Sequence, residues 1–157
     1  MKKMMPVLAA LILGTAPCLW AGQDEEAVTA LLLEAAKVTA DYSTTRDAES
    51  VLKMYAPDYA GVQDGEEETL ETVRKWLAEY GAELDKGSPL RFLGEVFGVK
   101  VHVAGQLAWA TYDYVFTLVS RGEIQTEDRG RCTSILRKEG ASWLIQHEHC
   151  SKAKQAG

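Results

Sequence analysis

The sequence predicts an α+β domain in which three N-terminal helices wrap a cone-shaped, curved antiparallel sheet. Two observations predict this fold. In the first half of the chain, apolar residues recur at the three- and four-residue spacing of amphipathic helices. In the second half, long stretches rich in Val, Ile, Thr and aromatic residues alternate with glycine-containing turns, as in consecutive antiparallel strands.

Three helices are expected before residue 90 of the chain. The first spans residues 24–42, where the apolar side chains form one continuous stripe. The second covers residues 46–55 and ends before Pro57, because the residue before a proline disfavours the helical conformation. The third covers residues 67–84. The acidic run 66–68 is interpreted as its start, where the helix dipole favours negative charge.

The strands are expected in one short and four long segments. The short strand, residues 59–62, is closed by the turn dipeptide Asp64-Gly65. The long strands cover residues 91–103, 107–119, 123–138 and 142–151. Gly94 and Gly98 are natural bend points in the first of them, so we expect the sheet to curve and to enclose a cavity against the helices.

The N-terminus has the layout of a cleaved export signal. Two lysines precede the apolar core 7–13, and Ala21 precedes a polar stretch. This core is too short to span a bilayer, which needs about 20 apolar residues. We therefore expect residues 1–21 to be a signal peptide, residues 22–157 to be a single domain, and the mature protein to be periplasmic or secreted.

Two alternatives for the N-terminus stay open. Cys18 could be lipidated, although Pro17 stands where a small residue is expected, or the apolar segment could remain uncleaved.

Composition argues against two classes of partner. The formal net charge is −6, and it becomes −8 once Lys2 and Lys3 are removed. An acidic chain without a basic run is unsuited to nucleic acid and to anionic lipid. We expect neither nucleic acid nor, after signal cleavage, a membrane as a partner.

Three sequence stretches resemble a known family. They are LKMYAPD at residues 52–58, GQLAWA at 105–110 and GASWLIQHEHCS at 140–151. With the order of the elements, they resemble the nuclear transport factor 2-like superfamily, and within it the SnoaL-like and calmodulin-kinase-association-like domains. The resemblance covers nearly all of residues 22–157 and implies a helix-wrapped curved sheet with a cavity.

The resemblance implies several activities, because the superfamily includes isomerases, cyclases, dehydratases, assembly domains and binding proteins. We expect an exported small-molecule-binding domain with a hydrophobic cavity. The first alternative is a small isomerase, cyclase or dehydratase using cavity His, Asp or Tyr side chains. The second is a dimerisation or assembly module, and a homodimer is expected because the exposed back of the sheet in this fold often dimerises.

The expected cavity lining comes from strand alternation and helix faces. Trp76 lies on the apolar face of the third helix, while Tyr55 offers a phenol. Alternation places Asp113 outward, on the side opposite the aromatic residues of its strand. The complete set of pocket candidates is Tyr55, Trp76, Tyr112, Tyr114, Phe116, Arg131, His147 and His149. Core filling is the alternative for Tyr112, Tyr114 and Phe116. A solvated strand face is the alternative for Arg131, and a structural or exposed position is the alternative for the two histidines.

The two histidines raise the question of a metal. His147 and His149 share one strand face and could chelate zinc only with a third ligand, for which His102 and Cys132 are candidates. The similar closing pattern of the family is mainly structural, and we predict neither a metal nor a cofactor.

The cysteine pair depends on the last hairpin. A three-residue loop, 140–142, places Cys132 directly opposite Cys150, which export would allow to form a disulfide. A four-residue loop, 139–142, puts the two sulfurs on opposite faces. Cys132 would then share its face with both histidines, and Arg131 would share the other with Glu148. We favour the bridge.

Overall fold

The computed structural model describes residues 18–153. The expected export signal therefore lies outside the described residues, except for residues 18–21, which form the start of the first helix. The elements are α1 (Cys18–Thr45), α2 (Ala48–Leu52), β1 (Tyr55–Gln63), β2 (Glu66–Thr69), α3 (Leu70–Asp85), β3 (Leu90–Ala104), β4 (Leu107–Ser120), β5 (Glu123–Glu139) and β6 (Ser142–Lys152).

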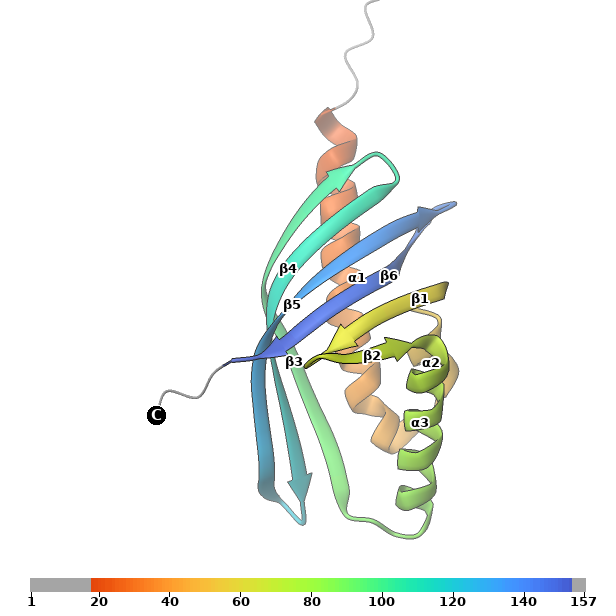
Figure 1. The fold of residues 1–157 in the computed structure, drawn as a ribbon, viewed down its shortest axis with the longest axis vertical. Helices are drawn as coiled ribbons and strands as arrows, with labels where there is room; N and C mark the ends of the chain where they lie inside the picture. The colour runs from red at the N-terminus through yellow and green to blue at the C-terminus, as the bar shows by residue number, and fades with distance from the viewer. Residues whose placement is uncertain (1–17, 154–157) are drawn as a thin grey trace, which may run out of the picture.

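The strands form one curved six-stranded sheet in the order β2-β1-β6-β5-β4-β3. Every neighbouring pair is antiparallel except β1 and β6, which run parallel, so the sheet is mixed. Figure 1 shows α1 crossing behind the long strands and α3 beside the short ones, so the helices gather on the hollow side of the sheet. The predicted α+β fold is confirmed, but the sheet is not wholly antiparallel.

Strand β2 was not predicted. The prediction placed the acidic run 66–68 at the start of the third helix, and this is wrong, because these residues belong to strand β2. Asp64 and Gly65 both have positive φ, 52° and 93°, which is the geometry of a tight hairpin turn that sends the chain back beside β1. The helix begins only at Leu70, where Thr69 caps it in a reciprocal bond pair with Thr72.

Strand β1 begins earlier than expected and contains Pro57. Its pairing with β6 is regular only from Ala60 onward, because the register shifts between Tyr55 and Ala60. Pro57 falls in that irregular part, where its missing N–H removes no ladder bond. The predicted second helix is correspondingly short and ends at Leu52.

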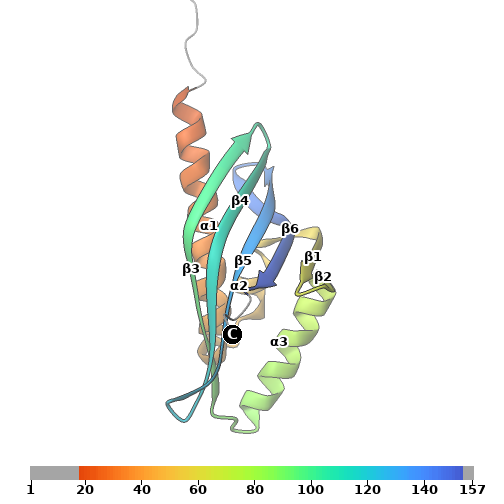
Figure 2. The ribbon, with the colours of Figure 1, turned by 60° about the vertical axis from the view of Figure 1, so that its left-hand side comes forward.

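Helix α1 lies along β3 and closes the hollow side of the sheet, as Figure 2 shows from a second direction. Two residues of this helix, Val28 and Leu32, are buried against the sheet. Near its start, Asp24 accepts hydrogen bonds from Lys138 at 2.5 Å and from Trp143 at 3.1 Å, which ties α1 to the β5–β6 hairpin. Among the described residues no helix combines the length and the apolar character that crossing a membrane requires.

The β5–β6 hairpin combines both expected registers. Next to the turn, Lys138 pairs with Trp143, as the four-residue loop requires. The register then shifts at Gln146, a β-bulge, and beyond it Cys132 lies opposite Cys150. The two cysteines are joined by a disulfide with a Cα–Cα distance of 4.1 Å. The predicted three-residue loop is thus wrong at the turn. The cysteine pairing inferred from it is present because the bulge shifts the register by one residue.

Candidate functional site

A cavity of about 260 Å³ lies between the helices and the hollow face of the sheet. Its wall is mostly apolar and aromatic, as ligand sites usually are. The residues around it are Leu32, Ala35, Ala36, Thr39, Val51, Tyr55, Gln63, Glu68, Val73, Trp76, Val96, Tyr112, Tyr114, Phe116, Cys132, Ile145, Glu148 and Cys150.

Five of the sequence-based pocket candidates lie in this wall: Tyr55, Trp76, Tyr112, Tyr114 and Phe116. The three from β4 point inward together because alternate residues of a strand share a face. Tyr112 and Tyr114 are almost completely buried, whereas Trp76 is partly open to solvent on α3. Trp76 stacks on Tyr80 with ring centroids 5.7 Å apart, which fixes its orientation at the rim. That these residues bind a ligand stays a prediction.

The polar centre of the cavity is Glu148 on β6. Its Oε1 accepts hydrogen bonds from the Tyr112 hydroxyl at 2.5 Å and from the Ser134 hydroxyl at 2.8 Å. The two hydroxyls also lie 2.9 Å from each other. Burial raises the pKa of Glu148, and the bonds from Tyr112 and Ser134 oppose that rise. Glu148 is therefore a positioned carboxyl group held by neutral donors.

A second carboxylate, Glu68 on β2, lies in the same cross-strand row. Gly61 on β1 stands opposite both Glu68 and Glu148. A Cβ atom on Gly61 would lie 2.4 Å from the Tyr59 hydroxyl, so the absent side chain is what lets Tyr59 fold across the strand. Tyr59 then donates to Glu68 Oε2 at 2.7 Å. The nearby carboxylates and burial keep the Tyr59 hydroxyl protonated, because both raise its pKa.

The remaining candidates lie outside the cavity, which corrects the expectation. Arg131 is exposed and its Nε donates to Asp113 Oδ1 at 2.8 Å on the outer face. His149 is exposed beside Thr133, and His147 Nδ1 lies 2.6 Å from the Ala60 carbonyl oxygen. The physical reason is the strand phase: once Cys150 faces inward, Glu148 does too, and both histidines face outward.

The outer face also carries exposed apolar side chains, namely Leu93, Phe97, Trp109 and Ile135. His102 stacks on Trp109 there, with ring centroids 5.2 Å apart. The homodimer stays a prediction.

The zinc alternative loses its possible ligands. The sulfur of Cys132 is bonded to Cys150 in the disulfide, and the His102 ring stacks on Trp109. Within residues 18–153, no three His, Cys, Asp or Glu side chains gather as a metal site would require.

Sequence reasoning missed Glu68, Glu148 and Ser134 as site residues. The first was assigned to a helix that begins later, so its strand neighbours were not considered. For Glu148 a signal was present: if Cys132 and Cys150 share the inner face, the residue two positions before Cys150 must share it as well.

Comparisons with known proteins agree with this fold. Residues 33–155 match the family model described as SnoaL-like domain. No curated protein matches the sequence.

Among solved structures, a Mycobacterium tuberculosis protein of unknown function is similar with a TM-score of 0.71 and 17% identity, over 91% of this chain and 78% of that one. A protein from Novosphingobium aromaticivorans, provisionally named a scytalone dehydratase, is similar with a TM-score of 0.67 and 9% identity, over 84% and 85%. A Xanthomonas campestris protein, provisionally named a calcium/calmodulin-dependent protein kinase II association domain, has a TM-score of 0.59 and 20% identity, over 94% and 95%.

Proposed function

The chain belongs to the SnoaL-like domain family, and on that premise we propose that it binds a small, largely apolar molecule in the cavity between its helices and its sheet. One observation carries the proposal: the mostly apolar cavity of about 260 Å³ contains a carboxyl group that is already oriented. Glu148 is held in place by hydrogen bonds from Tyr112 and Ser134, so the carboxyl group that would contact an occupant is preorganised.

A protein that only filled its core would gain nothing from this arrangement. Burying a carboxyl group costs free energy that an apolar side chain of similar volume would avoid. The cost is understandable if Glu148 contacts an occupant of the cavity, because the binding energy then offsets it.

Catalysis is the second candidate function, and Glu148 favours it specifically. A carboxyl group with a raised pKa beside the phenol of Tyr112 is suited to proton transfer, as an isomerase or dehydratase requires. One similar structure is provisionally named a scytalone dehydratase. The histidines and Asp113 invoked from the sequence take no part in this candidate, because they lie on the outer face.

Native mass spectrometry of the purified protein tests the binding proposal. We expect a population carrying an extra small-molecule mass that disappears on denaturation. Ala35→Phe, which places a ring in the cavity wall of α1, should abolish it, whereas Leu33→Phe, on the exposed side of α1, should leave it. An adduct retained equally in Ala35→Phe would contradict a cavity site.

We also propose that the protein works outside the cytoplasm. The Cys132–Cys150 disulfide supports this, because such bridges persist in oxidising compartments. The basic and apolar layout of residues 1–21 supports it independently. The intact mass of the exported protein should correspond to a start at or near Gly22, and a mature form that retains Met1 would contradict the proposal.

A further inference from the structure

We propose that the occupant of the cavity is a cation: an organic ammonium compound whose charged nitrogen lies against Glu148 and whose apolar part lies among the aromatic rings. This inference rests on the proposed binding function and narrows it to one ligand class. Three independent features of the wall support it.

The first feature is a free carboxylate oxygen. Both hydrogen bonds that the described residues donate to Glu148 go to Oε1, and none goes to Oε2. The side chain is held in place by one oxygen and keeps the other available. A nitrogen with N–H donors could use it in a charge-assisted bond, which is stronger than a neutral one.

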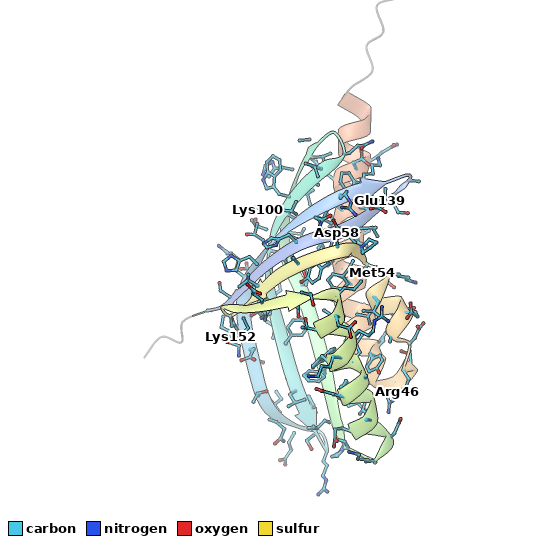
Figure 3. The ribbon with its side chains drawn as sticks, turned by 45° about the vertical axis from the view of Figure 1, so that its right-hand side comes forward. Arg46, Met54, Asp58, Lys100, Glu139 and Lys152 are labelled. Atoms are coloured by element: carbon cyan, nitrogen blue, oxygen red, sulfur yellow. A yellow bond between two sulfur atoms is a disulfide. The ribbon has the colours of Figure 1, made fainter. Side chains whose placement is uncertain are left out.

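The second feature is unbalanced negative charge. Glu68 and Glu148 both belong to the wall, whereas no Lys, Arg or His does. Two basic side chains of β5, Arg137 and Lys138, pair with acids outside the cavity wall. Arg137 pairs with Asp58 at 3.0 Å and with Glu139 at 2.5 Å, and these two acids lie together at the far end of the sheet in Figure 3.

Lys138 is likewise engaged, by Asp24 of α1 at 2.5 Å. Among the described residues, the basic group closest along the strand to Glu148 is His147, and it is not part of the cavity wall. Desolvation in the cavity raises the free energy of the charged form of Glu148, and a bound cation would offset that cost.

The third feature is the aromatic wall. The faces of Tyr, Trp and Phe rings carry negative quadrupole density that attracts cations, more strongly in a desolvated site. Five such rings line this cavity.

A protonated Glu148 would favour a different ligand. A neutral carboxylic acid donates a hydrogen bond, so the cavity would then prefer a neutral acceptor such as an alcohol or a ketone. The charge preference of the cavity decides between the two.

Three probes of nearly equal size isolate charge from shape: 2-phenylethylamine, which is a cation at neutral pH, 2-phenylethanol, which is neutral, and phenylacetate, which is an anion. Isothermal titration of the disulfide-intact protein at pH 7.5 should rank them in that order. We expect the amine to bind about tenfold more tightly than the alcohol, the difference that one charge-assisted hydrogen bond supplies.

Glu148→Gln keeps the shape and the acceptor for Tyr112 and Ser134 but removes the charge. It should weaken amine binding about tenfold and change alcohol binding much less, because the alcohol carries no charge. Glu95→Gln removes the same charge from an exposed position on β3 and should change neither affinity, which controls for net charge.

The outcomes separate the two proposals. Equal affinities for amine and alcohol in the wild type, both lost in Ala35→Phe, would overturn the cation and leave the binding cavity standing. An amine preference that survives Glu148→Gln would assign the charge selection to another group and overturn this inference. Absence of binding by all three probes, together with no small-molecule mass in the native spectrum, would overturn both.

Discussion

The two faces of the sheet formed by β4, β5 and β6 differ in how their charged side chains are compensated. On the outer face, Arg131 meets Asp113 in an ion pair surrounded by water. On the inner face, the hydrogen bonds that the described residues donate to the Glu148 side chain come from the hydroxyls of Tyr112 and Ser134. Neighbouring residues of one strand can therefore belong to very different surroundings. On β4, Asp113 takes part in the solvated ion pair, whereas the adjacent Tyr112 donates to Glu148 inside the cavity. The comparison teaches that titratable residues which stand out in the sequence are a poor guide to a site until the face they occupy is known.

Of the variants considered, removal of the disulfide on the inner face should lower the stability of the fold most. A bridge across 18 residues of sequence restricts the unfolded chain, and its loss is expected to cost about 3 kcal/mol. The Cys132→Ser/Cys150→Ser variant should therefore unfold at a clearly lower urea concentration than the oxidised wild type. Reduction of the wild type should reproduce that shift, and identical midpoints for all three samples would mean that the bridge does not stabilise the fold.

Gly61→Ala should cause the next largest loss of stability. The new methyl group would lie 2.4 Å from the Tyr59 hydroxyl and 3.0 Å from the Glu148 carbonyl oxygen, and such overpacking costs about 1–3 kcal/mol. Urea unfolding measures it. Adding Tyr59→Phe, which removes the clashing hydroxyl, should recover part of the loss, and strictly additive costs would show that the two residues do not touch.

The charge of Glu148 should make stability depend on pH. Because its pKa is raised in the folded state, the folded protein holds this proton more tightly than the unfolded chain. The stability linked to that proton is complete below the ordinary value of 4.5 and is lost as pH rises through the raised pKa.

Glu148→Gln should therefore melt at or above the wild-type temperature at pH 7, and the gap should shrink toward pH 4.5. The groups that face this carboxyl are Glu68, Tyr55, Tyr59, Tyr112 and, on its own strand, His147. Thermal melts of both proteins at several pH values measure the gap, and a gap that widens on acidification would contradict the raised pKa.

Substitution of a charged residue on the outer face should hardly change stability or ligand binding. Arg131→Ala breaks an exposed ion pair, and such pairs contribute little because water and salt screen them. Neither the unfolding midpoint nor the affinity for 2-phenylethylamine should change measurably. A loss of amine binding in Arg131→Ala would show that the two faces are coupled through β5.

The helices, the four long strands and the aromatic inner face of β4 could be predicted because each is written as a periodic pattern. Residues Tyr112, Tyr114 and Phe116 need only alternation to share a side. Strand β2 could not be predicted, because an acidic run suits both a helix start and an edge strand, and the turn at Asp64-Gly65 decided between them. The face of Glu148 depended on the bulge at Gln146, which no periodicity announces.

That bulge has a consequence for how such a cavity could change over evolution. Had the ladder continued regularly from the turn, His147 and His149 would face the helices, while Glu148 would face the solvent. The cavity wall would then lose the carboxylate of Glu148, gain two imidazoles and keep Glu68. A single-codon insertion or deletion in this hairpin could therefore change the charge balance of the wall without substituting any of its residues.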